Sequence, residues 1–398
     1  MRESKKPRES VLIPEEDIRR KAKEDTVDVK RRTLLKFAAG AAFNTLLPKA
    51  VTDGQVSTEA VSSPEGTIAT IERLTGMPYA EFSKNFDARV RVPSPRGGTY
   101  VIHIRQMHQH ARDPKNQVLG QSDVVARQQE TEKLIEAVVR ANKLDGIFAE
   151  GFAEKNAAQR YRDDIRQLQG QVAGLEKRSI RTTGDAEKAY AEFGGAYDAS
   201  LKNRTLYHYT MGDIRTLART LRKRFAALAP QSPAERARLA ELDSQLGAYG
   251  AERADLEIPD PYTEGAELKL FMDGKLKHIY PTEERAANER AIEATLAYKE
   301  ALKNFAGGRI RAEERDRYER IYRRDALEER ERILFGKVEE HARERTVAGK
   351  PPENIAILFG GRHDFTDMVR EQNKTPDRPG RGFIELWPKK LPRGPSLL

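Results

Sequence analysis

Four short apolar runs of this chain are each followed by a histidine or a glutamate. They read YVIHIRQMH, GIFAEGF, LKHIYPTEE and IAILFGGRH, and they deliver His108, Glu150, Glu283 and His363. Two imidazoles and a carboxylate can hold a divalent metal and leave a position for water, whose pKa then falls toward neutrality. Without a metal, a histidine oriented by a buried glutamate can take a proton from water. Both chemistries lead to hydrolysis.

These side chains can work together only if the four runs are neighbouring strands of one sheet. Compact apolar runs predict strands at residues 99–106, 146–149 and 355–359, and a helix over 121–144 connects the first two as in a right-handed parallel crossover. Ligands of open parallel sheets bind beyond the carboxyl ends of the strands. We therefore expect an α/β fold with a central mixed, largely parallel sheet flanked by helices, a charged helical insertion, and one shared site at the carboxyl edge of the sheet.

Simpler interpretations apply to several of these residues. A single histidine at a strand end is commonly an exposed or satisfied polar residue, and Glu150 could equally cap a following helix. His103 is expected to face a helix layer. Arg330 could direct its guanidinium at the site, but its Arg- and Glu-rich segment is more typical of a solvated helix face. The histidines interpreted as structural or solvent-exposed are His110, His208 and His341.

The composition excludes several kinds of site. The 398 residues include no cysteine, so neither a disulfide, nor a thiolate nucleophile, nor a zinc–thiolate centre can form. The net charge of +9 is not clustered, because Lys and Arg are interleaved with Glu and Asp along helix-forming stretches. No aromatic and basic platform accompanies this charge, which argues against a nucleic-acid partner. The chain also lacks G-x-S-x-G, phosphate-loop, G-x-G-x-x-G and H-E-x-x-H motifs.

The N-terminal segment resembles a twin-arginine export signal. Arg31 and Arg32 precede a moderately apolar stretch from Phe37 to Leu47, which is shorter than the roughly 20 apolar residues that a membrane-spanning helix needs. We expect the twin-arginine machinery to export the protein to the periplasm or the medium, with no membrane span in the mature chain. The alternative is an ordinary amphipathic helix after a basic pair, which would leave the protein in the cytoplasm.

The chain is expected to divide into six segments. Long, charged, helix-forming stretches between residues 153 and 257 predict a helical insertion within the α/β core. The predicted segments are the export signal at 1–50, a linker with a short helix at 51–96, the first part of the core at 97–152, the insertion at 153–257, the second part of the core at 258–370 and a C-terminal tail at 371–398.

A family resemblance is carried by four motifs in order: the strand before His108, the Glu-Gly-Phe at Glu150, DGKLKHIYPTEE with Glu283, and Gly-Gly-Arg-His ending at His363. Over about residues 97–370 this order resembles the superfamily of TraB proteins, TIKI Wnt-inactivating metalloproteases, ChaN-like haem-binding uptake lipoproteins and erythromycin esterases. The resemblance implies that His108, Glu150 and His363 are catalytic and hold a metal. It also implies that Glu283 is a second acidic catalytic position.

We therefore expect an exported hydrolase, a peptidase or an esterase, with a peptide or small-molecule substrate and a divalent metal ion as cofactor. Arg105, which stands where the family usually has glycine, and Arg362 are expected to bind substrate charge. The alternative is a non-catalytic protein that binds haem or another ligand in the same cleft, although few aromatic residues and methionines lie near the motifs. A third alternative is a structural protein whose helical insertion contacts other proteins. The sequence leaves the oligomeric state open.

Overall fold

A six-stranded mixed sheet with the order β1-β6-β2-β5-β3-β4 organises the fold. The computed structural model describes residues 63–95, 98–106, 121–251, 260–360, 363–375 and 380–389. β1 is antiparallel to β6, and the other neighbouring pairs are parallel. This architecture confirms the predicted α/β fold. The strands are β1 Phe86–Val92, β2 Tyr100–Gln106, β3 Gly146–Ala149, β4 His278–Pro281, β5 Ile355–Gly360 and β6 Gly382–Pro388.

Different helices cover the two faces of the sheet. The central strands β2 and β5 are buried on both faces, as their nearly continuous apolar sequences predict. Alternate residues belong to different cores: Ile102 and Leu358 pack in one, and Val101 and Ile357 in the other. The helices of the first core are α2 Pro64–Thr75, α3 Tyr79–Asn85, α4 Gln121–Asn142 and α9 Ala266–Met272, and those of the second are α12 Glu329–Val347 and α13 Thr366–Asn373.

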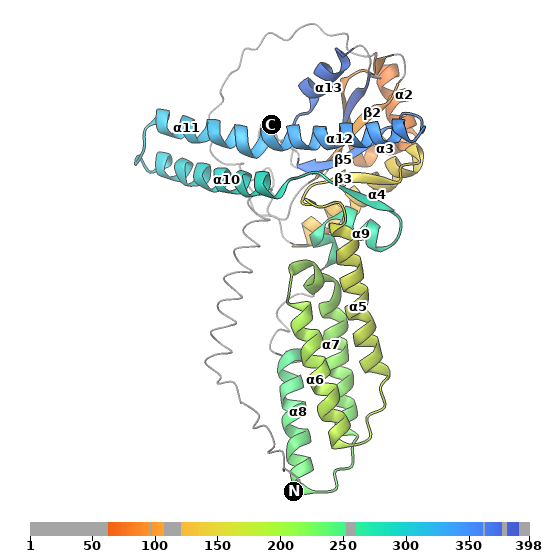
Figure 1. The fold of residues 1–398 in the computed structure, drawn as a ribbon, viewed down its shortest axis with the longest axis vertical. Coiled ribbons are helices and arrows are strands. Elements are labelled where there is room, and N and C mark those ends of the chain that lie inside the picture. The colour runs from red at the N-terminus through yellow and green to blue at the C-terminus, as the bar shows by residue number, and fades with distance from the viewer. Residues whose placement is uncertain are drawn as a thin grey trace, which may run out of the picture.

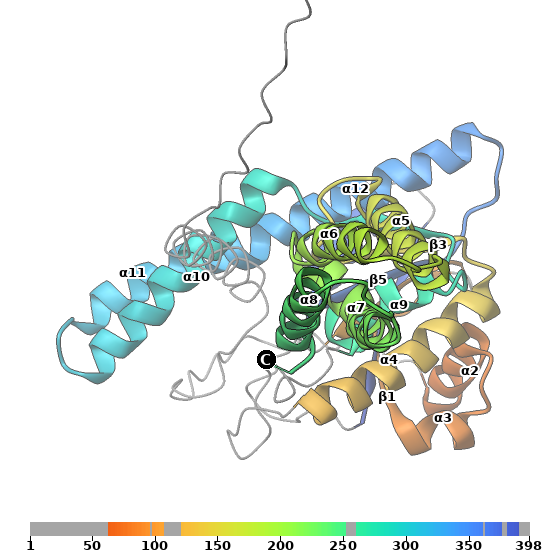
Figure 2. The ribbon, with the colours of Figure 1, turned by 90° about the horizontal axis from the view of Figure 1, so that it is seen from below.

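Four long helices form a bundle with an apolar core of its own, which includes Phe193, Leu221 and Leu242. The bundle extends downward from the sheet in Figure 1, and Figure 2 looks along it. A capping box between Thr182 and Asp185 begins its second helix. The stretch RTLYHYT forms the start of the third. The helices are α5 Ala157–Lys177, α6 Thr183–Ser200, α7 Arg204–Ala226 and α8 Pro233–Ala251.

A helical hairpin leads the chain back to the sheet. Helices α10 (Arg285–Ala306) and α11 (Ala312–Tyr322) lie side by side and extend away from the sheet (Figure 1). The π-helical turn η3 (Arg323–Glu328) joins α11 to α12 without a break. A π turn changes which side chains of a helix face its neighbours. This turn ends two residues before Arg330.

Two strands of the sheet, β1 and β6, were not predicted from the sequence. β1 lies within the segment predicted as a linker, and β6 lies within the segment predicted as a C-terminal tail. β6 occupies an interior position between β1 and β2, so residues 382–388 of the predicted tail contribute to the core instead. A short 3-10 helix, η2 (Pro261–Glu264), precedes α9. Among the described residues, no helix combines the length and the apolar character needed to cross a membrane.

Candidate functional site

The carboxyl ends of β3 and β4 bring two of the predicted carboxylates together. Glu150 follows β3, and its backbone N–H donates to the carbonyl of Leu358 on β5 at 3.0 Å. Glu283 follows β4, beside Thr282, whose hydroxyl donates to the carbonyl of Ala149 at 2.9 Å. These bonds continue the parallel pairing beyond the strand ends. The two acidic side chains are consequently delivered to one place at the edge of the sheet, as the sequence predicted.

A buried arginine lies between these two carboxylates. Nη2 of Arg330 is 2.7 Å from Oε1 of Glu150 and also pairs with Oε1 of Glu283. The side chains of Arg330, Glu150 and Glu283 are 2%, 4% and 2% exposed. The preferred interpretation of Arg330 as part of a solvated helix face is therefore wrong, and its guanidinium does point at the strand ends. Burial lowers the pKa of Arg330, but the charges of Glu283 and Glu150 more than offset this and raise it above its usual value.

Glu150 also fixes the end of β5. Its second oxygen, Oε2, accepts the backbone N–H of Gly360 at 2.7 Å. A carboxylate that binds both a guanidinium and a backbone amide is held in one orientation. The Arg330 guanidinium lies 5.0 Å from the ring centroid of Phe359, so it also contacts the last buried aromatic residue of β5. Glu150 and Arg330 together connect β3, β5 and α12.

His363 forms a separate pair with Glu331. Nδ1 of His363 lies 3.0 Å from Oε1 of Glu331, and the imidazole is 4% exposed. The same carboxylate oxygen accepts the backbone N–H of Asp364 at 3.3 Å, and the N–H of His363 donates to Gly360 at 3.2 Å. The His363 ring also packs edge-on against Phe359, with centroids 4.5 Å apart. Gly360 is therefore bonded to both Glu150 and His363.

Glu331 was not among the site residues predicted from the sequence. Arg330 and Glu331 are consecutive in α12, and successive residues of a helix point about 100° apart. One side chain therefore reaches the ends of β3 and β4 while the other reaches the loop after β5. Nothing distinguishes Glu331 from the other acidic residues of EERERILFGKV in the sequence, apart from its position next to Arg330.

Arg105 belongs to a second buried charge cluster. Its Nη2 lies 2.9 Å from Oε1 of Glu385 on β6, and Oε2 of the same carboxylate lies 2.7 Å from Nε of Arg91. The Arg105 guanidinium also stacks over Trp387 at 5.0 Å. Arg105 thus has protein partners for its charge, and its predicted contact with substrate stays a prediction.

His103 lies within the layer between β2 and the segment before α13, as expected from its alternation along the strand. Its Nε2 is 3.2 Å from the carbonyl of Phe359, and its ring packs edge-on against Phe365 with centroids 5.1 Å apart. Burial and the positive charge of Arg105 lower the pKa of His103 to about 3. The imidazole is therefore neutral at physiological pH.

The metal prediction depends on residues that the structure only partly describes. His108 and Arg362 lie outside the described residues, as do His110 and the predicted export signal. Within the described part of the chain, no group of three or more His, Asp or Glu side chains could hold a metal ion. Arg330 occupies the space between Glu150 and Glu283 that a cation would need, so these two carboxylates in this arrangement do not fit a divalent metal. A metal ligand set that includes His108 stays a prediction.

Comparison with known proteins identified no relative: no family model, no curated protein and no solved structure matches the chain. The resemblance to the TraB, TIKI and erythromycin esterase superfamily therefore depends on the four motifs alone.

Proposed function

We propose that the chain is an exported hydrolase-like protein, a peptidase or an esterase. In this proposal His363 activates water, and Glu331 orients the imidazole of His363. The observation that carries this proposal is the 3.0 Å contact between Nδ1 of His363 and Glu331, at the carboxyl edge of the sheet. If Nδ1 carries the proton that is donated to Glu331, Nε2 keeps its lone pair and can accept a proton. No described residue hydrogen-bonds Nε2.

In the proposed reaction, His363 takes one proton from water and later gives the same proton to the leaving group. A water molecule gives a proton to Nε2 of His363 while its oxygen attacks the carbonyl carbon of an ester or amide. The negative charge of Glu331 stabilises the imidazolium that forms, because it lies beside Nδ1. The imidazolium then gives the proton to the departing alcohol or amine as the bond to the carbonyl carbon breaks.

Glu150, Glu283 and Arg330 act in this proposal as positioning residues. Glu150 binds the backbone of Gly360, and Gly360 accepts the backbone N–H of His363. Arg330 holds Glu150 in place and precedes Glu331 in α12. The ion-paired cluster therefore fixes both the loop that carries the base and the helix that carries its orienting carboxylate.

The same cluster favours a second candidate function. A guanidinium that pairs with two buried carboxylates holds the ends of β3 and β4 together, which suits a non-catalytic protein that binds a ligand near these strand ends. Such a protein would keep its fold and still bind its ligand after His363 is replaced by Gln, whereas the hydrolase would lose its activity.

Hydrolysis of p-nitrophenyl acetate and of a mixed peptide library separates the two candidates. We expect the wild-type protein to hydrolyse one of them, and His363→Gln and Glu331→Gln to reduce the rate by about 100-fold or more. His208→Gln is the matched control, since His208 is also paired through Nδ1 with a glutamate, Glu264, at 3.1 Å. Full activity in His363→Gln would contradict the hydrolase proposal. A wild-type protein inactive on both substrates would favour the binding protein.

A further inference from the structure

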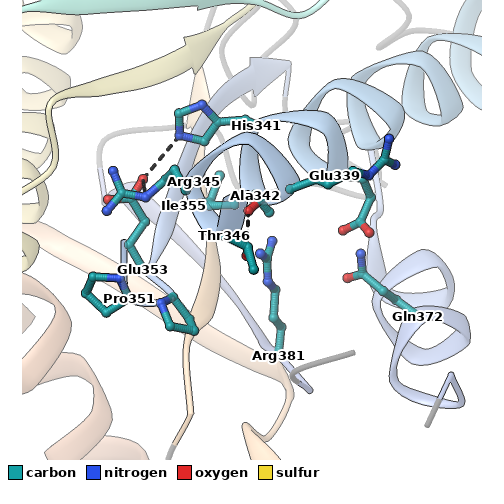
Figure 3. Close-up of a pocket in the computed structure, with 12 residues that line it drawn as sticks. Glu339, His341, Ala342, Arg345, Thr346, Pro351, Glu353, Ile355, Gln372 and Arg381 are labelled. Carbon is teal, nitrogen blue, oxygen red and sulfur yellow. Dashed lines mark hydrogen bonds and ion pairs between the residues drawn. The ribbon is translucent and has the colours of Figure 1, made fainter. Parts of the chain in front are cut away.

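A pocket lies at the amino end of β5, whereas the candidate site lies beyond the carboxyl end of the same strand. Its walls come from the second half of α12, from the segment that enters β5, from α13 and from the residue before β6 (Figure 3). β5 is six residues long, so the pocket and the candidate site are about 17 Å apart along this strand. The pocket volume is about 240 Å³, below the roughly 300–1,000 Å³ typical of sites for drug-sized ligands. It therefore fits a small molecule.

Arg381 contributes a buried guanidinium to this pocket. The residue is 5% exposed, and its Nη1 is buried with no hydrogen-bond partner among the described residues. Its backbone N–H and carbonyl both bond to the side chain of Asn373, each at 2.8 Å, so the backbone is fixed. Figure 3 shows the guanidinium turned toward α12. Because arginine stays protonated in proteins, this position holds a desolvated positive charge.

The acidic residues around Arg381 do not provide its partner. The carboxylate of Glu353 is 3.1 Å from Nε2 of His341 and 3.0 Å from Nε of Arg345, so it is already bound by two other groups. Burial lowers the pKa of Arg381, and the charges of Glu339 and Glu353 oppose that shift without cancelling it. No ion pair within 4.0 Å joins Arg381 to any residue in the described ranges. The charges of Glu339 and Glu353 therefore act on Arg381 from beyond ion-pair distance.

A second unpartnered polar atom lines the same pocket. Oε1 of Gln372, on α13, is buried with no hydrogen-bond partner in the described part of the chain. A buried donor and a buried acceptor that both lack partners cost stability unless a ligand or water satisfies them. Pro351 and Ile355 add apolar surface beside them.

We propose that this pocket binds a small organic carboxylate that carries an adjacent hydrogen-bond donor, such as a hydroxy acid. The carboxylate accepts from Nη1 of Arg381, and the hydroxyl of the ligand donates to Oε1 of Gln372. A singly charged carboxylate matches the single positive charge of Arg381, and the charge of Glu339, which also lines the pocket, opposes the binding of a phosphate dianion. This binding is independent of the hydrolysis proposed at the other edge of the sheet.

The test uses two ligands that differ by one hydroxyl group. Calorimetric titration of the full chain with lactate and with propionate should show both binding, with lactate at least tenfold tighter. Arg381→Met should abolish binding of both ligands, and Gln372→Met should bind the two equally well. Arg285→Met is the control, because it removes a positive charge that is 88% exposed, and it should leave both affinities unchanged.

The thermal midpoint of the unliganded protein provides an independent measurement. Without ligand, Arg381→Met should unfold at the same temperature as the wild type or above it, since it removes an unpaired buried charge. A lower midpoint would show that Arg381 has a structural counterion, and it would overturn the proposal. Tighter binding of inorganic phosphate than of lactate would do the same, as would the absence of lactate binding at about 10 mM.

Discussion

Arg330 and Glu150 join the start of α12 to the end of β3 through an ion pair in which Nη2 and Oε1 are 2.7 Å apart and both side chains are almost fully buried. Glu283 binds the same Nη2, so one guanidinium nitrogen serves two carboxylates. Two carboxylates and one guanidinium give the cluster a formal charge of −1, and without the guanidinium this charge would be −2.

Removal of this cation should destabilise the protein strongly. Arg330→Met leaves two buried carboxylates without a counterion, and we expect the free energy of unfolding in urea to fall by about 3–5 kcal/mol. Arg290→Met is the matched control. Arg290, on α10, pairs with Glu329, which directly precedes Arg330 in α12, but the Arg290 side chain is 48% exposed. The control should lose far less stability. Equal losses in the two variants would show that the Arg330 pairs contribute no more than surface ion pairs.

Acid should weaken the fold through His103. The pKa of His103 is about 3 in the folded protein and about 6.5 in an unfolded chain. Between these values the unfolded state binds the extra proton, so the free energy of unfolding falls as the pH falls below 6.5, by at most about 1.4 kcal/mol per pH unit from this residue. Urea unfolding from pH 7 to pH 5 should show a smaller loss for His103→Gln than for the wild type. Replacing the exposed His278 by Gln should leave the slope unchanged.

The pairing of His363 with Glu331 should be visible in the tautomer of the imidazole. Nitrogen-15 NMR of the wild-type protein should show the proton of neutral His363 on Nδ1, because Glu331 accepts from it at 3.0 Å. In Glu331→Gln the amide can either accept or donate, so the preference for this tautomer should weaken. A wild-type spectrum with the proton on Nε2 would contradict the role of Nε2 as the base.

Metal analysis separates water activation by His363 alone from the metal alternative. Because Arg330 fills the space between Glu150 and Glu283, we expect protein that has folded in the cytoplasm to contain less than one divalent metal ion per chain. A stoichiometric metal that is lost in His363→Ala would instead support the ligand set of His108, Glu150 and His363.

Export should depend on the arginine pair near the N-terminus. Replacing Arg31 and Arg32 together by lysine should retain the protein in the cytoplasm, because the twin-arginine machinery reads the pair itself and not only its charge. The measurement is the distribution of the protein between cytoplasmic and periplasmic fractions. Unchanged export in the double variant would exclude this route.

The parts of the fold with strong local signals could be predicted from the sequence. The runs at β3 and β5 are short, apolar and bounded by polar residues, and the structure places strands there. Because β3 and β4 are parallel neighbours, the convergence of Glu150 and Glu283 followed from topology.

Other features depend on contacts between distant segments. Arg330 lies in a segment that is charged all round, and only the packing of α12 against the sheet decides that it is buried while Arg332, two residues later, is exposed. β6 was missed because a short apolar run after a Pro- and Gly-rich stretch has the local signal of a tail. Its role became clear only from its pairing with β1 and β2.

The position of β6 also sets the order in which the protein can mature. Among the described strands β6 comes last in the sequence, yet it lies between β1 and β2, which come first among them and do not pair with each other. A nascent chain that ends before residue 382 would present two unsatisfied strand edges where the finished sheet has none, and such edges promote association with other chains. Completion of the sheet therefore has to wait until residues 382–388 are synthesised, and truncations before residue 382 should be recovered as aggregates rather than as smaller folded proteins.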